Sequence, residues 1–448
     1  MSQSKVQINQ EIENIKQKVS DALALAKSFG VSEAEVAISR QRGLSISSRN
    51  CEVETVEFNQ DGALGISVYR DGRKGSASTA DLSDDALKRT VKAACDIANH
   101  TSEDKCAGLA DKDLLEFNPK DLDLYHAHQL DSDDGIKMAI EAEEAAFAVS
   151  DKITNSDGAN VSAHEGFRVY GNTHDQLVGY PTTRYSISCG MIAQGDELMQ
   201  RDSQYTLNRN FNLLRSAADI GRESAQSAVA KLNARKLDTM EVPVLFRADI
   251  ASSLFSHLVS AIGGGNVYRK TTFMLDKVGE QILSKNINIS EKPHLIAGIA
   301  STPFDSEGVK THEQEIITDG VLNSYLLATY AARRLDLKST GHAGGIHNWI
   351  VQPTLGDFDD VIKTMDKGLI VTELMGQGVN IVNGDYSRGA GGFWVENGKI
   401  QYPVNEITIA SNLADMYMNI VGCGSDVDMR SNVQTGSILI EKMRVAGN

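Results

Sequence analysis

The sequence predicts an α+β fold with a two-layer α/β N-terminal domain over residues 9–99, a middle α+β domain over 122–235 and a β-rich, glycine-rich C-terminal domain over 240–448. Three observations support this prediction. Helical and period-two apolar patterns alternate in the first half of the chain. Polar stretches separate the three regions, and the third region shows mainly short strand patterns between glycines. A length of 448 residues also suits about three domains.

The first domain shows two helical patterns and a hairpin signal. Apolar residues at three- and four-residue spacing over 12–26 predict a helix, and period-two patterns over 36–68 predict antiparallel strands. The Asp71-Gly72 pair is typical of a hairpin turn, and Ser83 is a suitable N-cap for a second helix. Two helices on one face of a sheet would bury these apolar residues, which gives the two-layer arrangement.

A polar, acidic stretch over about 100–125 is expected to be a linker. The middle domain is expected to begin with a helix, continue with alternating strands and close with an alanine-rich helix near 213–232. In the C-terminal domain, helices are expected at Asp249–Ile262 and Phe358–Met365. Strands are expected at Val242–Phe246, Val321–Leu327, Phe393–Val395 and Ile407–Ile409.

Composition narrows the classes of function. With 44 basic and 60 acidic residues the formal net charge is −16, which argues against sequence-independent binding of nucleic acid. No apolar run approaches the roughly 20 residues of a membrane helix, and the N-terminus lacks the apolar core of a secretory signal. Five scattered cysteines suit buried thiols in a reducing compartment. We therefore expect a cytoplasmic protein without membrane or nucleic-acid partners.

The common catalytic motifs are absent. The chain contains neither the Gly-x-Ser-x-Gly motif nor a P-loop, and Gly376-Gln-Gly378 lacks the third glycine of a dinucleotide-binding loop. His164-Glu165 and His312-Glu313 each lack a second histidine four or five residues later, so neither matches a helical zinc site. We expect no catalytic and no metal-ligating residue in this chain.

The expected helix at Asp249–Ile262 carries a single histidine. Asp249 is a plausible N-cap, and the glycines at 263–265 would end the helix. His257 borders the apolar stripe, so it is interpreted first as a hydrogen-bonded packing residue and second as a residue that lines a cleft. No second histidine stands at 261 or 262, so this helix cannot form a two-histidine zinc site.

Glycines are dense between residues 342 and 394, where they permit tight turns and close backbone approach. The polar side chains among them either satisfy buried backbone groups or line a cleft. The candidate cleft residues are His257, Arg269, His342, His347, Asp385, Tyr386 and Arg388.

Long segments of the second half resemble the TldD/PmbA metallopeptidase family, and within it the PmbA (TldE) branch. The resemblance extends over nearly the whole chain and rests on the segments Val267–Phe273, Ser301–Val309, Ser339–Trp349, Glu373–Val379, Gly384–Ala390 and Phe393–Val404. It implies a two-layer N-terminal α+β domain joined to a β-rich C-terminal domain. It also implies a cytoplasmic zinc-dependent peptidase built as a TldD–TldE heterodimer, which matures a peptide antibiotic and degrades a small antitoxin. The family also carries an older description as a modulator of DNA gyrase.

The resemblance also implies where zinc ligands would stand. In the TldD branch a helix carries His-Glu-x-x-x-His, and a cysteine near the C-terminus completes the set. Counted back from Arg269-Lys270, those helix positions hold Ser256, His257 and Ala261 here. The cysteine position falls near Gln434 or Thr435, and Cys423 lies too early to replace it. We therefore expect no zinc in this chain and expect zinc in a TldD-like partner.

Three hypotheses follow. In the first, the chain is the subunit without metal and shapes a cleft for small or unfolded peptides. In the second, it is a non-proteolytic regulator that acts on DNA gyrase or on a toxin–antitoxin pair. In the third, it is an independent peptidase with a metal site that involves His342, His347 or Cys423. The chain could also form a homodimer when alone.

Overall fold

The N-terminal half of the chain folds around one six-stranded antiparallel sheet, in a computed structural model that describes residues 3–196 and 198–447. The strand order is β3-β2-β1-β4-β5-β6. The hairpin predicted at Asp71-Gly72 joins β2 to β3, and both residues have the positive φ that this turn requires. The strands are β1 (Glu33–Arg49), β2 (Glu52–Arg70), β3 (Arg73–Thr79), β4 (Ile153–Asn172), β5 (Leu177–Gln194) and β6 (Met199–Asn208).

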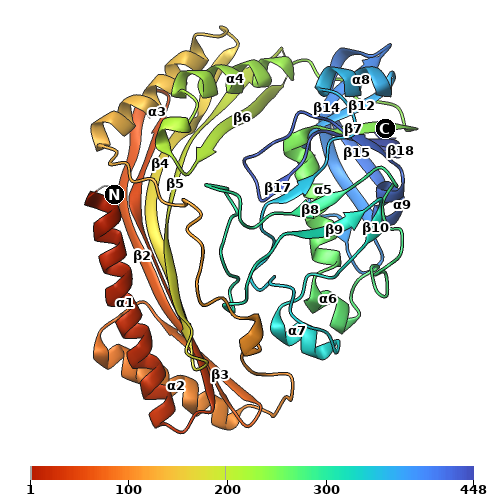
Figure 1. Cartoon of the computed structure of the whole chain (residues 1–448). Helices are drawn as coiled ribbons and strands as arrows, with labels where there is room; N and C mark the ends of the chain where they lie inside the picture. Colours follow the sequence, from red (N-terminus) through yellow and green to blue (C-terminus); the bar gives the residue numbers. More distant parts are fainter. Residues whose placement is uncertain (1–2, 197, 448) are drawn as a thin grey trace.

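Four helices cover one face of this sheet (Figure 1): α1 (Gln3–Ser28), α2 (Asp84–His100), α3 (Ser132–Phe147) and α4 (Ala217–Ala230). Ser83 caps α2 as predicted, because its hydroxyl accepts a hydrogen bond from the Ala86 amide. Helices α1 and α2 bury one apolar cluster against β1, β2 and β4, whereas α3 and α4 bury a separate one. The expected N-terminal and middle domains thus share a continuous sheet through the β1–β4 pairing. We propose 9–99 and 122–235 as two folding units on that sheet.

The segment between α2 and α3 packs against the C-terminal half. Leu115 forms a β-bridge with Val309, and both side chains are buried. The Arg333 guanidinium donates to the Leu109 carbonyl at 2.6 Å and to the Asp111 carboxylate at 2.8 Å. A short 3₁₀ turn, η1 (Lys112–Leu114), lies within this segment, and a second, η2 (Phe211–Leu213), precedes α4. The stretch expected as a linker therefore ties the two halves of the molecule together.

The C-terminal half contains a seven-stranded sheet and a five-stranded sheet. The larger consists of β7 (Met240–Phe246), β12 (Gly368–Met375), β13 (Val379–Asn380), β14 (Asp385–Glu396), β15 (Lys399–Asn412), β16 (Ile420–Cys423) and β18 (Ile438–Ala446). The smaller consists of β8 (Ile289–Glu291), β9 (Gln314–Thr318), β10 (Val321–Leu322), β11 (Trp349–Val351) and β17 (Val433–Gln434). The helices are α5 (Ala248–Ala261), α6 (Gly264–Arg269), α7 (Thr329–Arg334), α8 (Phe358–Met365) and α9 (Leu413–Met418).

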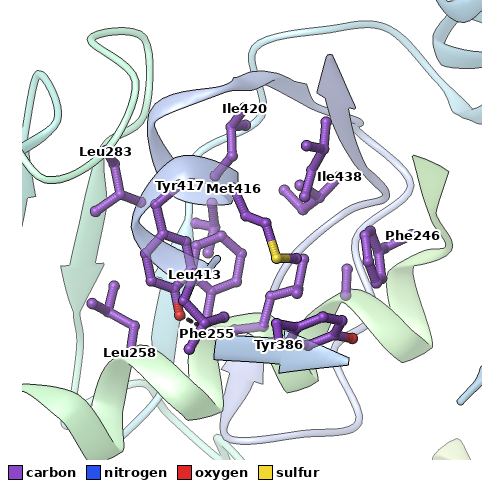
Figure 2. Packing of buried hydrophobic residues seen from close by; sticks show 14 of the residues in the cluster. Phe246, Phe255, Leu258, Leu283, Tyr386, Leu413, Met416, Tyr417, Ile420 and Ile438 are labelled. Carbon is purple, nitrogen blue, oxygen red and sulfur yellow. Dashed lines mark hydrogen bonds between the residues drawn. The ribbon is translucent and has the colours of Figure 1, made fainter. Parts of the chain in front are cut away.

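The larger sheet curls into a ring, because β12 pairs with both β7 and β14. Helices α5 and α9 contribute to its main apolar core, which Figure 2 shows around Phe255, Tyr386 and Tyr417. The prediction of α8 is confirmed at both ends. The strand expected at Val321–Leu327 is shorter, because it ends at Leu322 before the chain turns toward α7.

The C-terminal half lies against the sheet face that the four helices leave uncovered (Figure 1). Tyr170 and Val178 from the sheet pack with Phe304. The Arg168 guanidinium donates to Ser306, and the Tyr180 hydroxyl lies 3.0 Å from the Thr302 hydroxyl. Of the five cysteines, all free, three are buried and two are half-buried. No helix among the described residues is long and apolar enough to cross a membrane.

Candidate functional site

Helix α5 starts earlier than the sequence indicates and is capped differently. Its N-cap is Arg247, not Asp249, and the Ala248 amide donates to the Ser437 hydroxyl at 3.0 Å. A residue distant in the sequence therefore supplies the capping acceptor. Asp249 lies in the first turn, where both carboxylate oxygens accept from the Arg247 guanidinium at 2.7 Å. The glycines after the helix do not all lie in a loop, because Gly264 begins α6.

His257 lies on α5 with its ring 6.1 Å from the Tyr386 ring, centroid to centroid, in an edge contact. It packs as the sequence suggests, but its buried Nε2 has no hydrogen-bond partner among the described residues. The expectation of a hydrogen-bonded packing histidine is thus only half met. Burial lowers the pKa of His257, and the positive charge of Arg388 lowers it further.

Tyr386 and Arg388 lie two residues apart on β14 and so project from the same face of the sheet. The Tyr386 hydroxyl and the Arg388 Nε are also buried without a partner in the described part of the chain. Burial raises the pKa of Tyr386 to about 12, and the charge of Arg388 opposes this rise. The structure therefore brings His257, Tyr386 and Arg388 together, and we call these three residues the β14 cluster.

Asp385 and Arg269 do not join that cluster. Asp385 precedes Tyr386 on β14, so its side chain projects from the opposite face, where it is exposed and accepts from the Asn383 amide at 2.6 Å. Arg269 ends α6 and lies over the Tyr268 ring, with its guanidinium carbon 5.2 Å from the ring centroid. Neither side chain forms a hydrogen bond or an ion pair with the β14 cluster in the described structure.

His342 and His347 are buried on either side of Glu291, the last residue of β8. The His342 Nε2 is 2.5 Å from Glu291 Oε2, and its Nδ1 is 2.8 Å from the Thr340 hydroxyl. The His347 amide donates to Glu291 Oε1. Burial lowers the pKa of His347 to about 4. Gly344 and Gly345 between the histidines adopt φ of 96° and 124°, which only glycine adopts readily. We call Glu291, His342 and His347 the β8 cluster.

The other two histidine–glutamate pairs do not form sites. On β4, His164 lies 3.3 Å from the Ser45 hydroxyl, whereas Glu165 projects from the other face and accepts from Arg42 and Tyr125. His312 and Glu313 are both exposed.

Comparison of the sequence with known proteins identifies related proteins along nearly the whole chain. Models of PmbA/TldA metallopeptidase domain 1, central domain and C-terminal domain match residues 34–98, 125–232 and 239–447. The metalloprotease PmbA of Escherichia coli O157:H7 is 53% identical over 98% of each chain. The PmbA homologue of Haemophilus influenzae is 51% identical over 97% of each.

The chain belongs to the PmbA/TldD family.

Solved structures agree with this assignment. A proposed modulator of DNA gyrase from Bacteroides thetaiotaomicron superposes with a TM-score of 0.92 and 28% identity, over 97% of this chain and 99% of that one. TldE from Thermococcus kodakarensis gives 0.85 at 22% identity, over 96% and 100%, which shows the shared fold. The resemblance and the α+β fold class predicted from the sequence are confirmed.

The positions at which the resemblance implies zinc ligands hold side chains that do not together fit a metal ion. The Ser256 side chain is exposed and donates to the Ser252 carbonyl at 3.0 Å. Ala261 has no ligating atom in its side chain. Gln434 and Thr435, near the expected cysteine position, are buried. Of the α5 positions, only His257 offers a metal-ligating nitrogen.

Of the alternative ligands proposed from the sequence, His342 and Cys423 fit poorly, whereas the His347 Nδ1 is buried without a hydrogen-bond partner among the described residues. Both ring nitrogens of His342 already contact Glu291 and Thr340. Burial raises the pKa of the Cys423 thiol, which disfavours the thiolate that binds metals. Within residues 3–196 and 198–447, no group of three or more His, Cys, Asp or Glu side chains is placed to hold a metal ion.

Sequence analysis missed Glu291, which organises both histidines of the β8 cluster. Its local sequence, Ile289-Ser-Glu, carries no motif, so only the fold shows that this carboxylate is buried. Part of the β14 cluster could have been predicted, because the two-residue spacing of Tyr386 and Arg388 places both side chains on one face of a strand.

Proposed function

We propose that this chain is the subunit without zinc of a heterodimeric zinc-dependent peptidase. The family consists of metallopeptidases, and the proposal concerns how this member takes part. The observation that supports it is the α5 face, where Ser256, His257 and Ala261 stand at the positions for which the resemblance implies ligands in the TldD branch. A relative named metalloprotease TldD homologue, from Buchnera aphidicola, matches 85% of this chain at 21% identity. A zinc-bearing subunit of that kind is the proposed partner, in the cytoplasm.

The proposed role of this chain is to shape a cleft that accepts small or unfolded peptides. A hollow of about 500 Å³ lies along β13, a short edge strand of the seven-stranded sheet. Its lining includes Ser387 and Ser411. Extended peptides can add to such an edge by backbone hydrogen bonds, which give affinity with little dependence on sequence. Peptide maturation and antitoxin degradation are the reactions that this arrangement would serve.

A peptide-cleavage assay tests the proposal. This chain, a TldD-like subunit and the mixture are each assayed with and without chelator, and zinc is measured in each purified sample. We expect cleavage that depends on the mixture and stops with chelator, and no stoichiometric zinc in this chain alone. Chelator-sensitive cleavage by the isolated chain, or one zinc bound per chain, would overturn the proposal.

The second candidate is a non-proteolytic regulator of DNA gyrase or of a toxin–antitoxin pair. The structural relatives from Bacteroides thetaiotaomicron and Thermotoga maritima are both described as proposed modulators of DNA gyrase, which favours this candidate. Replacement of the zinc ligands in the partner distinguishes the two candidate functions. A biological effect that survives this replacement supports regulation, and one that disappears supports proteolysis.

A further inference from the structure

A cavity of about 650 Å³ opens on the helix-free face of the six-stranded sheet, where β1, β2, β4 and β5 meet Ile299 of the C-terminal half. This volume lies in the range of small-ligand sites, roughly 300–1,000 Å³. Apart from His164, the charged residues that lie on this side are Arg168, Arg184, Arg209 and Asp61, whereas Arg40 and Glu165 alternate with residues of this face and project toward the helices. Guanidinium groups therefore outnumber carboxylates locally, in a chain whose net charge is −16.

Existing bonds leave this excess of positive charge in place. Glu165 is already engaged, because its oxygens accept from Arg42 at 2.7 Å and from the Tyr125 hydroxyl at 2.6 Å. Asp61 is the remaining carboxylate of the lining. The Arg168 guanidinium already donates hydrogen bonds to Ser306 of the C-terminal half.

Arg209 is a buried cation without a carboxylate partner in the described structure. Its side chain lies in the cavity wall, and the residue is only 9% exposed. The guanidinium donates to the carbonyls of Gly298 and Ile299 at 2.9 and 2.7 Å, so neutral oxygens hold it. Burial lowers the pKa of Arg209 to about 10, and the nearby charge of Arg184 adds to this. Buried charges are normally paired, so an anion in the cavity would compensate this one.

Arg184 is the cation free to contact such an anion, because its side chain forms no hydrogen bond or ion pair within residues 3–196 and 198–447. Arg40 shares the opposite face of the sheet with Ile38, which packs against α1. Arg184 stands directly opposite His164 in the β4–β5 register and projects from the same face of the sheet. Neutral polar side chains that could bond a peptide backbone lie beside them, namely Ser39, Gln41 and Thr182.

A second hollow, of about 760 Å³, gives the contrast. It lies near the first helix, and its lining includes Ser4, Gln7 and Arg42. Arg42 is neutralised there by Glu11 and Glu165, at 3.1 and 2.7 Å. The unpaired guanidinium groups are therefore a property of the first cavity and not of every hollow in this half of the molecule.

We propose that the cavity between the two halves binds a carboxylate of an extended peptide, with Arg184 as its ion-pair partner and Arg209 as a fixed positive charge. The peptide nature of the ligand rests on the proposed function. The carboxylate can come from an acidic side chain or from the C-terminus of the peptide. Guanidinium groups recognise either one with charge-assisted hydrogen bonds.

Fluorescence anisotropy with the isolated full-length chain tests the proposal. The probes are three short fluorescent peptides: one with glutamates and an amidated C-terminus, the same sequence with glutamines, and the glutamine peptide with a free C-terminal carboxylate. We expect at least one carboxylate peptide to bind about tenfold more tightly than the amidated glutamine peptide. The peptide that gains identifies the source of the carboxylate. Equal binding of all three, or no binding, would overturn the proposal.

Two variants locate the site. Arg184→Gln replaces an exposed side chain that forms no hydrogen bond or ion pair within the described protein, so the chain should fold normally. The roughly tenfold affinity difference between carboxylate and amidated peptides should mostly disappear. Lys92→Gln, on the exposed face of α2, removes the same charge from a residue outside the cavity lining and should bind like the wild type. Equal effects of the two variants would show a nonspecific charge effect and would overturn the proposal.

The failure of this inference can be distinguished from failure of the proposed function. Carboxylate binding that Arg184→Gln abolishes supports the cavity even when the mixed subunits do not cleave peptides. Chelator-sensitive cleavage by the mixture without any carboxylate preference in this chain retains the proposed function and overturns the cavity.

Discussion

The β8 and β14 clusters lie in the same half of the molecule but satisfy their polar atoms differently. In the β8 cluster, Glu291 accepts from the His342 ring and from the His347 amide. In the β14 cluster, one polar atom of each residue, the His257 Nε2 among them, is buried without a partner in the described chain. Buried polar groups are nearly always hydrogen-bonded in folded proteins. Glu291 therefore holds the β8 cluster together and leaves the His347 Nδ1 as its unpartnered atom in the described chain, whereas all three residues of the β14 cluster leave one polar atom unpartnered.

This difference qualifies the use of histidines as markers of function. His342 stands in a dense glycine motif, yet it is buried and both of its ring nitrogens contact polar partners. His257 stands in an ordinary amphipathic helix, yet its ring nitrogen is unsatisfied. The bonding of the ring nitrogens therefore distinguishes His342 from His257, but it does not distinguish His347, whose buried Nδ1 also lacks a hydrogen-bond partner in the described structure.

The largest expected effect is the loss of the buried carboxylate in the β8 cluster. Glu291→Ala leaves the His342 Nε2 and the His347 amide without their acceptor. Removal of one partner from a buried, charge-assisted contact costs about 3–5 kcal/mol. Urea unfolding should show this loss of stability.

Glu315→Ala is the matched control, because Glu315 lies opposite Ser290 on the neighbouring strand β9 and is exposed. It should change the unfolding free energy by less than about 0.5 kcal/mol. If both variants unfold at the same urea concentration, the β8 cluster does not stabilise the fold and the comparison with the β14 cluster fails.

The second expected effect is a pH dependence that belongs to His347. Its pKa is about 4 when folded, compared with 6.5 ordinarily. The unfolded chain therefore binds a proton between these values that the folded chain does not, and acidification destabilises the fold. Between pH 7 and pH 4 the wild type should lose up to about 3 kcal/mol relative to His347→Gln.

The wild type must be compared with His347→Gln because a second group, Asp305, changes the stability in the opposite direction with pH. Burial raises the pKa of Asp305 to about 7, so this carboxyl group favours the folded state below that pH and loses its contribution as the pH rises. Asp305 is present in both chains, and its effect cancels in the difference. Stability curves that run parallel from pH 7 to pH 4 would show that His347 does not titrate as its burial implies.

The sequence predicted the local features well and the long-range features poorly. The turn at Asp71-Gly72 and the helix Phe358–Met365 depend on neighbouring residues, and both are confirmed. The start of α5 depends on Ser437, which lies far away in the sequence, so the local signal of Asp249 was misleading. The β1–β4 pairing that unites the first two units is equally long-range.

The candidate site shows the same division. Tyr386 and Arg388 share a strand face because side chains alternate along a strand, which the sequence alone reveals. That His257 lies beside Tyr386 depends on how α5 packs on the sheet. The contact of Glu291 with both histidines depends on strand β8, whose three residues are too few for a periodic pattern.

The smallest expected effect separates two buried tyrosines of one core (Figure 2). The Tyr417 hydroxyl donates to the Leu254 carbonyl at 2.8 Å, and Tyr417→Phe should cost about 1 kcal/mol. The Tyr386 hydroxyl has no partner among the described residues, so Tyr386→Phe should leave the unfolding free energy unchanged or raise it slightly. Chemical unfolding of both variants measures this difference.

If Tyr386→Phe costs as much as Tyr417→Phe, the Tyr386 hydroxyl has a partner in solution, and the neighbouring Arg388 guanidinium is the candidate. The β14 cluster would then be as satisfied as the β8 cluster, and its unused bonding capacity would no longer distinguish the two.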